Sequence, residues 1–480
     1  GYTNDPTTFK NRSTPAPSTR SMACKAQTSG RIYLHNGPRT ELHEIIRQEY
    51  ARHQDRAVPR NTLRQAVQGM LDTFAYQNFD AAAGEYTNRC CRPPRETEMR
   101  PWRLVTEIGW TGGGVLAYPL VLCRDALGAD AEAPLAAAMS GEQLFDRIAD
   151  AYNENSGLLN DLMAPNAAGS QVNGWWTGYG LVKDCHCAYT VGSAVHYLTK
   201  TMDYLHQNGK PCPAKWMDAA QKVLHTVMDL QRADGAFGYT YSTQERRVLD
   251  WSGFAGCWFA PALVYLYRLT GEERCLHSAE KALDYYHTFV KDLNCYGTPM
   301  DTWKAVDEEG NLAFMRGSRL LYEQTGKAEF LQYMKDSAGY EFLWRYGYKT
   351  YPEHTPLNQG WSACGGAVTS VSNPHIHPMG VIIDTDLRYL ARVTGDGYYA
   401  SRAADSAAWM LQCLELYPAA TGYGRYGILS ERWCPSDGLD VERFSDGRPF
   451  SSWFSHNLWA SACVLEAACE LLLEIEHKKG

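Results

Sequence analysis

The stretch Tyr267-Arg-Leu-Thr-Gly271, followed closely by Ala282-Leu-Asp-Tyr-Tyr286, contains a template that the chain repeats. The same arrangement begins again at Tyr322-Glu-Gln-Thr-Gly326 and at Ala391-Arg-Val-Thr-Gly395. In each copy an apolar helix ends at Thr-Gly, a few polar residues follow, and a second, amphipathic helix begins. Glycine after the last helical turn takes the left-handed conformation that lets the chain reverse, so each copy predicts a helical hairpin. One hairpin buries only one face, so a repeated hairpin predicts a stacked array.

Looser copies of the template extend over most of the chain. Amphipathic helices are expected to start near residues 61, 141, 213, 273, 328 and 397, and apolar helices near 109, 187, 252, 310, 377 and 455. The apolar set is rich in small and aromatic residues, as in Phe254-Ala-Gly-Cys-Trp258. Helices that are apolar on most sides belong inside, and amphipathic ones outside. The sequence therefore predicts an all-α protein, an (α/α)6 barrel of six helical hairpins in a closed toroid.

Composition limits the class of protein further. The chain has 480 residues, 45% of them hydrophobic, and a net charge of −8. Residues 1–40 are polar and rich in Pro, Ser and Thr, which predicts an extended N-terminal arm before one catalytic toroid at 41–480. The negative charge offers no basic surface for nucleic acid, and no apolar run is long enough to cross a membrane. The sequence leaves homo-oligomerisation open.

Fifteen cysteines is an odd and high number, but most of them lie among apolar residues of predicted helices. Buried thiols of this kind behave as small hydrophobic groups, which favours reduced cysteines and a bacterial cytoplasmic protein. Cys185-His186-Cys187 could seed a zinc site completed by Cys364, His375 or His377. No Cys-x-x-Cys pair supports that alternative, so we predict neither metal nor cofactor.

The long links between hairpins are expected to carry the function. They run from each outer helix to the next inner helix, at 77–108, 153–186, 232–251, 293–309, 345–376 and 415–454. Since every hairpin points the same way, all of these links emerge on one rim, where the inner helices also begin. Long links are usually functional, and the positive ends of helix dipoles face that rim. Tryptophans and tyrosines crowded with charged residues suit sugar rings, so the expected partner is an oligosaccharide.

At this point the chain resembles the six-hairpin glycosidase-like superfamily of carbohydrate enzymes, over roughly residues 60–475. The resemblance is carried by the hairpins, by Gln231-Arg-Ala-Asp-Gly-Ala-Phe-Gly-Tyr239 after an outer helix, and by Asp250-Trp-Ser-Gly253 before an inner one. It implies a toroid fold and carbohydrate chemistry. The nearest members in size and loop content are unsaturated glucuronyl hydrolases and related β-glucuronidase-type glycoside hydrolases, which implies a role in polysaccharide degradation.

Hydrolysis of a glycoside needs a protonated carboxyl and a second carboxylate. We expect Asp250 and Glu431 to form this pair, with Glu107 and Asp301 as the next candidates. Asp250 is expected to sit at a helix start, which lowers its pKa and suits a base or nucleophile. Glu431, beside Trp433, is expected to be partly desolvated, which suits a general acid. The spacing of the two carboxyls, and so a retaining or inverting outcome, stays open.

The remaining candidates bind the sugar. We expect a pocket on the long-link rim whose substrate-binding residues are His186, Tyr239, Arg247, Trp251, Trp361, His375, His377 and Trp433. Arginines in or beside the links (Arg246, Arg247, Arg345 and Arg425) favour an exo-acting glycoside hydrolase on a small, uronate-containing oligosaccharide, because arginine pairs with carboxylates. One alternative is a polysaccharide lyase in which Tyr239 or a histidine removes the proton next to the uronate carboxyl. A sugar 2-epimerase that uses rim histidines is another, and a helical scaffold is disfavoured by the long polar links.

Overall fold

We describe the protein from a computed structural model. The residues it describes are 32–34, 36–53, 56–80, 85–90, 100–104, 108–109, 113–128, 132–163, 170–176, 181–298, 304–350, 362–371, 373–414, 416, 427, 429–433, 435, 452–453, 455–456 and 458–478. The chain divides into two compact units, 1–37 and 38–480. In the first unit, the described residues 32–34 and 36–37 lie outside helices and strands. Everything that follows concerns the second unit.

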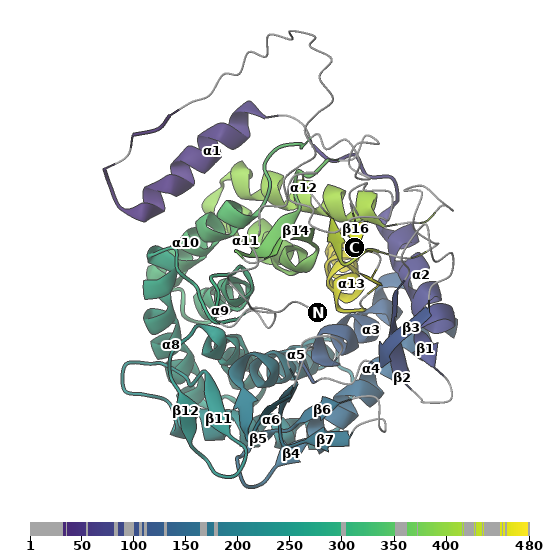
Figure 1. The fold of residues 1–480 in the computed structure, drawn as a ribbon, viewed down its shortest axis with the longest axis vertical. Helices are drawn as coiled ribbons and strands as arrows, with labels where there is room; N and C mark the ends of the chain where they lie inside the picture. The colour runs from purple at the N-terminus through teal and green to yellow at the C-terminus, as the bar shows by residue number, and fades with distance from the viewer. Residues whose placement is uncertain are drawn as a thin grey trace, which may run out of the picture. The chain divides into compact units, whose positions relative to one another are not determined.

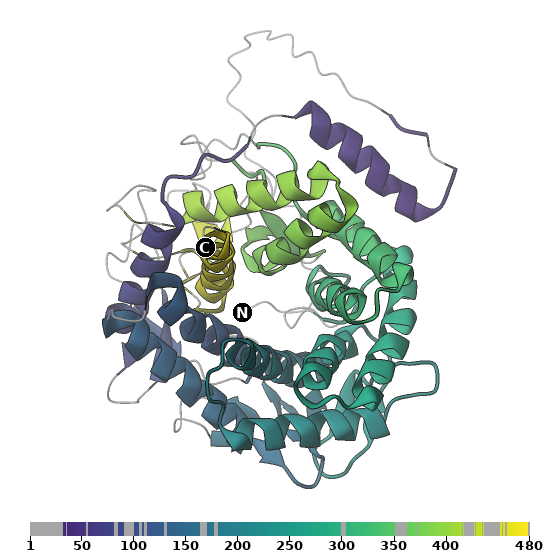
Figure 2. The same cartoon turned by 180° about the vertical axis from the view of Figure 1, so that it is seen from behind.

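The second unit is built from two concentric rings of helices (Figures 1 and 2). The outer ring consists of α2 (Leu63–Thr73), α4 (Glu132–Asp150), α6 (Ala214–Asp229), α8 (Glu273–Lys291), α10 (Ala328–Trp344) and α12 (Gly397–Cys413). The inner ring consists of α3 (Gly113–Leu127), α5 (Ala188–Gln207), α7 (Phe259–Thr270), α9 (Glu309–Thr325), α11 (Asp384–Thr394) and α13 (Leu458–His477). Short helices η3 (Ala255–Trp258) and η5 (Met379–Ile383) lead into α7 and α11. The predicted (α/α)6 barrel is confirmed.

Most of the predicted helix starts fall within a few residues of the observed ones. The largest difference is at α4, which begins at Glu132 and not near residue 141. The helices α7 and α11 begin seven residues after the predicted positions, because η3 and η5 precede them. Gly141 lies inside α4, where a Cβ atom would stand 2.6 Å from the carbonyl oxygen of Ala117 in α3. This glycine therefore permits close packing of two helices and does not mark a boundary. A further helix, α1 (Leu42–Arg52), preceded by η1 (Arg39–Glu41), lies outside the ring beside α10 and α12 (Figure 1).

The Thr-Gly turns share one geometry, which explains the repeated template. Gly271, Gly326 and Gly395 all have positive φ, at 72°, 66° and 69°. The hydroxyl of the threonine before each glycine donates to the carbonyl four residues earlier, at 2.6–2.8 Å, and accepts from the N–H two residues later, at 3.2–3.3 Å. The backbone groups at each helix end thus find hydrogen-bond partners within a few residues. The motif can therefore be recognised from the sequence alone.

Short strands occupy the long links, all at the end of the barrel where the inner helices begin. They are β1 (Phe79–Asp80), β2 (Glu85–Cys90), β3 (Arg100–Leu104), β4 (Tyr152–Asn153), β5 (Leu158–Leu159), β6 (Asp161–Met163), β7 (Ser170–Val172), β8 (Gly174–Trp176), β9 (Leu181–Lys183), β10 (Cys185–Cys187), β11 (Thr240–Ser242), β12 (Val248–Asp250), β13 (Ala367–Ser370), β14 (Asn373–His377), β15 (Arg432–Trp433), β16 (Ser452–Trp453) and β17 (Ser455–His456). Antiparallel pairs β10–β11, β14–β15 and β17–β2 join neighbouring links to one another. Backbone hydrogen bonds therefore connect these neighbouring links along the rim.

The interior of the inner ring is filled by a buried cluster of charges. Lys200 of α5 pairs with Glu466 and with Glu470 of α13, the latter at 2.8 Å, and the Tyr197 hydroxyl donates to Glu466 at 3.0 Å. The positive charge of Arg316 in α9 also acts on both glutamates. Because α5, α9 and α13 are not neighbours in the ring, these contacts cross the barrel axis. We call Lys200, Glu466, Glu470 and Arg316 the axial plug.

Candidate functional site

The N-terminal ends of three alternate inner helices meet near the barrel axis. The hydroxyl of Tyr189, at the start of α5, lies near the carboxyl of Glu309, the first residue of α9, and the charge of that carboxyl acts on it. Both residues also interact electrostatically with Cys463, in the second turn of α13. Each of the three is less than 10% exposed. Since the positive ends of the helix dipoles converge here, this point favours a carboxylate and other groups of negative charge.

Aromatic rings stand around this point, supplied by neighbouring inner helices. Trp258, at the end of η3, packs edge-on against Tyr189 with ring centroids 5.7 Å apart. Trp459, at the start of α13, stacks on His377 with centroids 6.1 Å apart and an angle of 16° between the rings. The indole N–H groups of Trp258 and Trp459 are buried and have no hydrogen-bond partner among the described residues. Two buried donors of this kind suit the hydroxyl groups of a polar ligand.

The carboxyls before Glu309 anchor the start of α9. Asp307 accepts hydrogen bonds from the backbone N–H groups of Gly310, at 3.1 Å, and Thr298, at 3.0 Å. Burial raises its pKa to about 7 in spite of these bonds. Glu308 is fully buried, and burial together with the nearby carboxyl of Glu341 raises its pKa well above the ordinary value. Burial and the neighbouring carboxyl both favour the protonated form of Glu308, behind the axis.

Asp250 does not cap a helix, so that expectation is wrong. It is the last residue of β12, and η3 begins only at Ala255, with no side-chain cap on its first turn. Its Oδ2 is paired with Lys304 Nζ at 2.5 Å, and its Oδ1 accepts from the backbone and hydroxyl of Ser252 at 2.8 and 2.7 Å. Partial burial opposes ionisation, but these bonds outweigh it and lower the pKa of Asp250. The carboxyl is charged for a reason that the sequence analysis did not anticipate.

Glu431 lies in a different sheet from Asp250. It precedes β15, which pairs with β14 so that Trp433 stands opposite Ile376, between His375 and His377. Glu431 itself is half-buried. The two histidines are largely buried, and burial lowers both pKa values, that of His375 to about 4, with the charge of Arg432 adding to the effect. No contact among the described residues brings Glu431 and Asp250 together as a pair.

The other predicted binding residues are spread over the rim. His186 of β10 is buried, its Nε2 lies 2.9 Å from Ser156 Oγ, and burial lowers its pKa to about 4. Tyr239 is also buried, with Lys304 Nζ 4.9 Å above its ring. Arg247 is exposed and paired with Glu245 at 2.7 Å. Trp251 is half-buried beneath the guanidinium of Arg232, at 5.1 Å. Glu107, Asp301 and Trp361 lie outside the described residues.

The sequence analysis missed Glu309 and Glu308, although a signal was present. Asp307-Glu308-Glu309 places three consecutive carboxyls at the predicted start of the fourth inner helix, between apolar residues. Acidic residues are common in the first turn of a helix, where the dipole stabilises them. Because this role is so common, the three carboxyls gave no sign that Glu309 would lie near the barrel axis.

The cysteines and the candidate zinc residues form no metal site in the described part of the chain. No three His, Cys, Asp or Glu side chains among the described residues are arranged to hold a metal ion. The described cysteines are free thiols. Burial raises the pKa of Cys185 to about 11 and that of Cys187 to about 12, so both remain protonated. No helix within the described ranges is long and apolar enough to cross a membrane.

Comparison with known proteins places the fold. No protein-family model matches the chain, and no curated protein matches it. The solved structures similar to it include a glycoside hydrolase family 76 mannosidase from Bacteroides thetaiotaomicron, with a TM-score of 0.53 and 14% identity over 86% of this chain and 99% of that one. A family 76 α-mannanase from the same organism gives a TM-score of 0.55 and 12% identity, over 88% and 98% of the chains.

Another similar structure is the cellobiose 2-epimerase of Spirochaeta thermophila, with a TM-score of 0.54 and 12% identity over 92% of this chain and all of the other. These proteins share the (α/α)6 toroid of the six-hairpin glycosidase-like superfamily, and this chain has the same fold. At such low identity the likeness concerns the fold, which is known to hold more than one kind of carbohydrate chemistry.

Proposed function

We propose that this protein is a carbohydrate-active enzyme, and specifically a glycoside hydrolase that acts on a small oligosaccharide at the barrel axis. The observation that carries the proposal is the position of Glu309. Its buried carboxyl lies near the Tyr189 hydroxyl where the inner-helix dipoles converge, and the buried indole N–H of Trp258, which packs against Tyr189, has no described partner. A carboxyl beside aromatic rings and a free donor suits the binding and protonation of a glycoside.

A second carboxyl is needed to complete the reaction. We assign this role to Glu431, because it directly precedes β15, which lies in the same sheet as His377, and the ring of His377 stacks on Trp459 at the start of α13. Asp250 is the competing candidate. Its lowered pKa suits a charged base, but its carboxylate is already paired with Lys304. In either case one carboxyl protonates the leaving oxygen, and the other activates water or attacks the sugar.

The uronate part of the proposal rests on fewer residues than the sequence suggested. The guanidinium of Arg345 is fully buried and held by Glu341, at 2.7 Å, and by Asp384, at 2.9 Å. It supports the end of α10 and is not open to a substrate. Arg247 remains exposed. Neutral sugars are therefore tested together with uronates. Mannosides and cellobiose are chosen because the names of the similar structures mention a mannosidase and a cellobiose epimerase.

A lyase reaction that uses Tyr239 is less well supported, because a tyrosine must be deprotonated before it can accept the proton next to the uronate carboxyl. Burial raises the pKa of Tyr239 far above the range in which a tyrosine could serve. The epimerase alternative is favoured by one observation. Burial and Arg432 keep His375 and His377 neutral, and a neutral imidazole can remove the proton from C2 of a reducing sugar.

One set of assays separates these reactions. The protein is incubated with nitrophenyl α-mannoside, β-glucoside and β-glucuronide, with uronate oligosaccharides, and with mannose or cellobiose in D₂O. Nitrophenol release supports the hydrolase, and new ultraviolet absorbance from C4–C5 unsaturation supports the lyase. Deuterium at C2 of the free sugar, seen by NMR, supports the epimerase. Absence of all three signals would contradict a carbohydrate-active enzyme of any of these kinds.

A further inference from the structure

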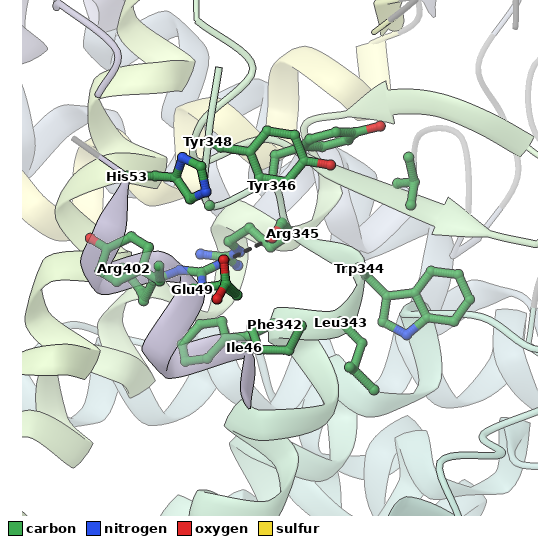
Figure 3. A pocket seen from close by; sticks show the side chains of 13 residues that line it. Ile46, Glu49, His53, Phe342, Leu343, Trp344, Arg345, Tyr346, Tyr348 and Arg402 are labelled. Carbon is green, nitrogen blue, oxygen red and sulfur yellow. Dashed lines mark hydrogen bonds between the residues drawn. The ribbon is translucent and has the colours of Figure 1, made fainter. Parts of the chain in front are cut away.

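A second site for a ligand lies away from the axis, between α1 and the end of α10. Here the described residues enclose a cavity of about 440 Å³, which is in the size range of small-molecule sites. Its walls come from Ile46, Glu49 and Tyr50 of α1, from His53 just after that helix, from residues 342–348, and from Val368 and Arg402. None of the residues assigned to the axial site lines it. Figure 3 shows the aromatic side chains facing this cavity from both of its sides.

The helix that closes the cavity is held firmly on the barrel. Arg47 of α1 forms two hydrogen bonds with Asp396, at 2.7 and 2.9 Å, and the Tyr50 hydroxyl donates to Asp405 at 2.5 Å. Arg56 pairs with the same Asp405 at 3.3 Å. The wall formed by α1 is therefore built from specific polar bonds to α12, and the cavity behind it is a feature of the packed structure.

Arg402 gives the cavity its chemical character. Its side chain is only 1% exposed, and its guanidinium carbon lies 4.2 Å from the ring centre of Phe342 and 4.8 Å from that of Tyr50. One terminal nitrogen donates to the carbonyl of Arg345 at 2.8 Å and the other to the Tyr398 hydroxyl at 3.4 Å, while Nε has no partner. No described carboxylate lies within ion-pair distance of it. A buried, unpaired guanidinium favours an anionic ligand.

The remaining polar groups of the cavity are compatible with such a ligand. The carboxylate of Glu49 is already paired with Arg52, and the guanidinium of Arg345 is taken up by its own two carboxyls. On the other side, Tyr348 is 46% exposed, and its ring centre lies 5.4 Å from that of Tyr346 and 5.8 Å from that of His53. These rings offer faces on which a pyranose can stack.

We propose that this cavity is a second saccharide site, which binds the carboxylate of an acidic sugar through Arg402 and stacks its ring on Tyr348 and its neighbours. That the ligand is a sugar rests on the proposed function; that it is an anion rests on Arg402. The site would hold an acidic residue of a longer chain while the axial site acts on another part. Catalysis on a small substrate does not need it.

The test uses calorimetric titration of the full chain with sodium D-glucuronate, and with D-glucose as the matched neutral sugar. Glucuronate should bind and glucose should bind at least about tenfold more weakly, as expected for loss of a charge-assisted pair. Tyr348→Ala and Arg402→Gln should each weaken glucuronate binding by a similar factor. Tyr76→Ala, which removes an 86% exposed tyrosine outside the cavity, should leave it unchanged. Since Tyr348 is exposed, its variant remains informative if the Arg402 variant fails to fold.

Three results would overturn the proposal: equal binding of glucose and glucuronate, unchanged glucuronate binding in Tyr348→Ala, or loss of that binding in Glu309→Gln. The last would place the sugar at the axis. Turnover of small nitrophenyl substrates should be unaffected in Tyr348→Ala, so the second site can fail while the proposed hydrolase stands, and the reverse also holds.

Discussion

The hydroxyl of Tyr189 and the carboxyl of Glu309 meet across the barrel axis, although their helices, α5 and α9, are not neighbours in the inner ring. Burial, with the negative charge of Glu309 beside it, raises the pKa of Tyr189 well above its ordinary value, so the tyrosine remains a donor at all working pH values. The proximity therefore places a neutral hydroxyl donor next to Glu309. It is the geometric basis for treating this carboxyl as the reacting one.

Glu309→Gln tests that role directly. The amide keeps the size of the side chain and can still accept from Tyr189, so the free energy of unfolding should change little. Turnover should fall at least about a hundredfold, the usual scale for loss of a general acid or base. Initial rates on whichever substrate the assay panel identifies, together with the thermal midpoint, decide the matter. Near-normal turnover would remove Glu309 from the mechanism.

Asp250→Asn and Glu431→Gln, measured beside it, identify the second carboxyl. The residue that completes the pair should lose turnover at least about a hundredfold, while the other should retain most of its activity. We expect the larger loss in Glu431→Gln. Asp250→Asn should instead free Lys304 from its ion pair, with a modest effect because the Asp250 side chain is 32% exposed. The opposite ranking would assign the role to Asp250.

The axial plug predicts a large loss of stability from one substitution. Lys200→Met removes the cation that neutralises Glu466 and Glu470, leaving two carboxylates buried in the barrel. Breaking a buried ion pair in this way costs about 3–5 kcal/mol. Urea unfolding gives the number. Lys222→Met is the matched control, because Lys222 pairs with Asp218 at 3.0 Å on the exposed face of α6 and its loss should be silent. Equal effects of the two would contradict a plug that stabilises the barrel.

The buried histidines predict how stability varies with pH. His186 and His375 each have a pKa of about 4 in the folded protein, lowered by burial from an ordinary 6.5. The unfolded chain therefore binds protons that the folded one rejects, so stability is full above pH 6.5 and falls as the pH drops toward 4. Each histidine contributes a slope of up to about 1.4 kcal/mol per pH unit in that window.

His186→Gln should make this slope shallower, because glutamine does not titrate and can still bond to Ser156. The measurement is the free energy of unfolding at several pH values between 4 and 7. His277→Gln serves as the control, since His277 is exposed on α8 and should leave the slope as it is. An unchanged slope in His186→Gln would show that this histidine is protonated without cost in the fold.

The fold was predictable because the turns that end its helices depend only on residues close in sequence. Each Thr-Gly turn satisfies its helix end within a few residues, so Gly271 and its counterparts announce the hairpins in the sequence. The start of α4 was predicted too late, and the close contact of Gly141 inside that helix with Ala117 is visible only once two helices are packed. The site was less predictable for the same reason. Which carboxyl of residues 307–309 faces the axis depends on the rotation of α9 in the closed ring. Arg345 is occupied by Glu341, one helical turn earlier, and by Asp384, which only the closed ring brings beside it.

Gly380 is the position where the anchor of α9 can be disturbed without touching a charge. It lies in η5, and a Cβ atom there would collide with Glu308 Oε1 and stand 2.9 Å from Glu341 Oε1. Gly380→Ala should therefore push the side chains of Glu308 and Glu341 aside and shift the start of α9. Overpacking of this kind costs about 1–3 kcal/mol. Because Glu309 follows Glu308 directly, turnover should fall as well.

Gly397→Ala is the control for this substitution. Gly397 is the first residue of α12, and a Cβ atom there meets nothing within 4 Å, so alanine should change the free energy of unfolding by no more than about 0.5 kcal/mol. Urea unfolding and initial rates of both variants make the comparison. If Gly380→Ala were as stable and as active as Gly397→Ala, the carboxyl pair would have room to move, and Glu308 could not be the group that fixes Glu309 at the axis.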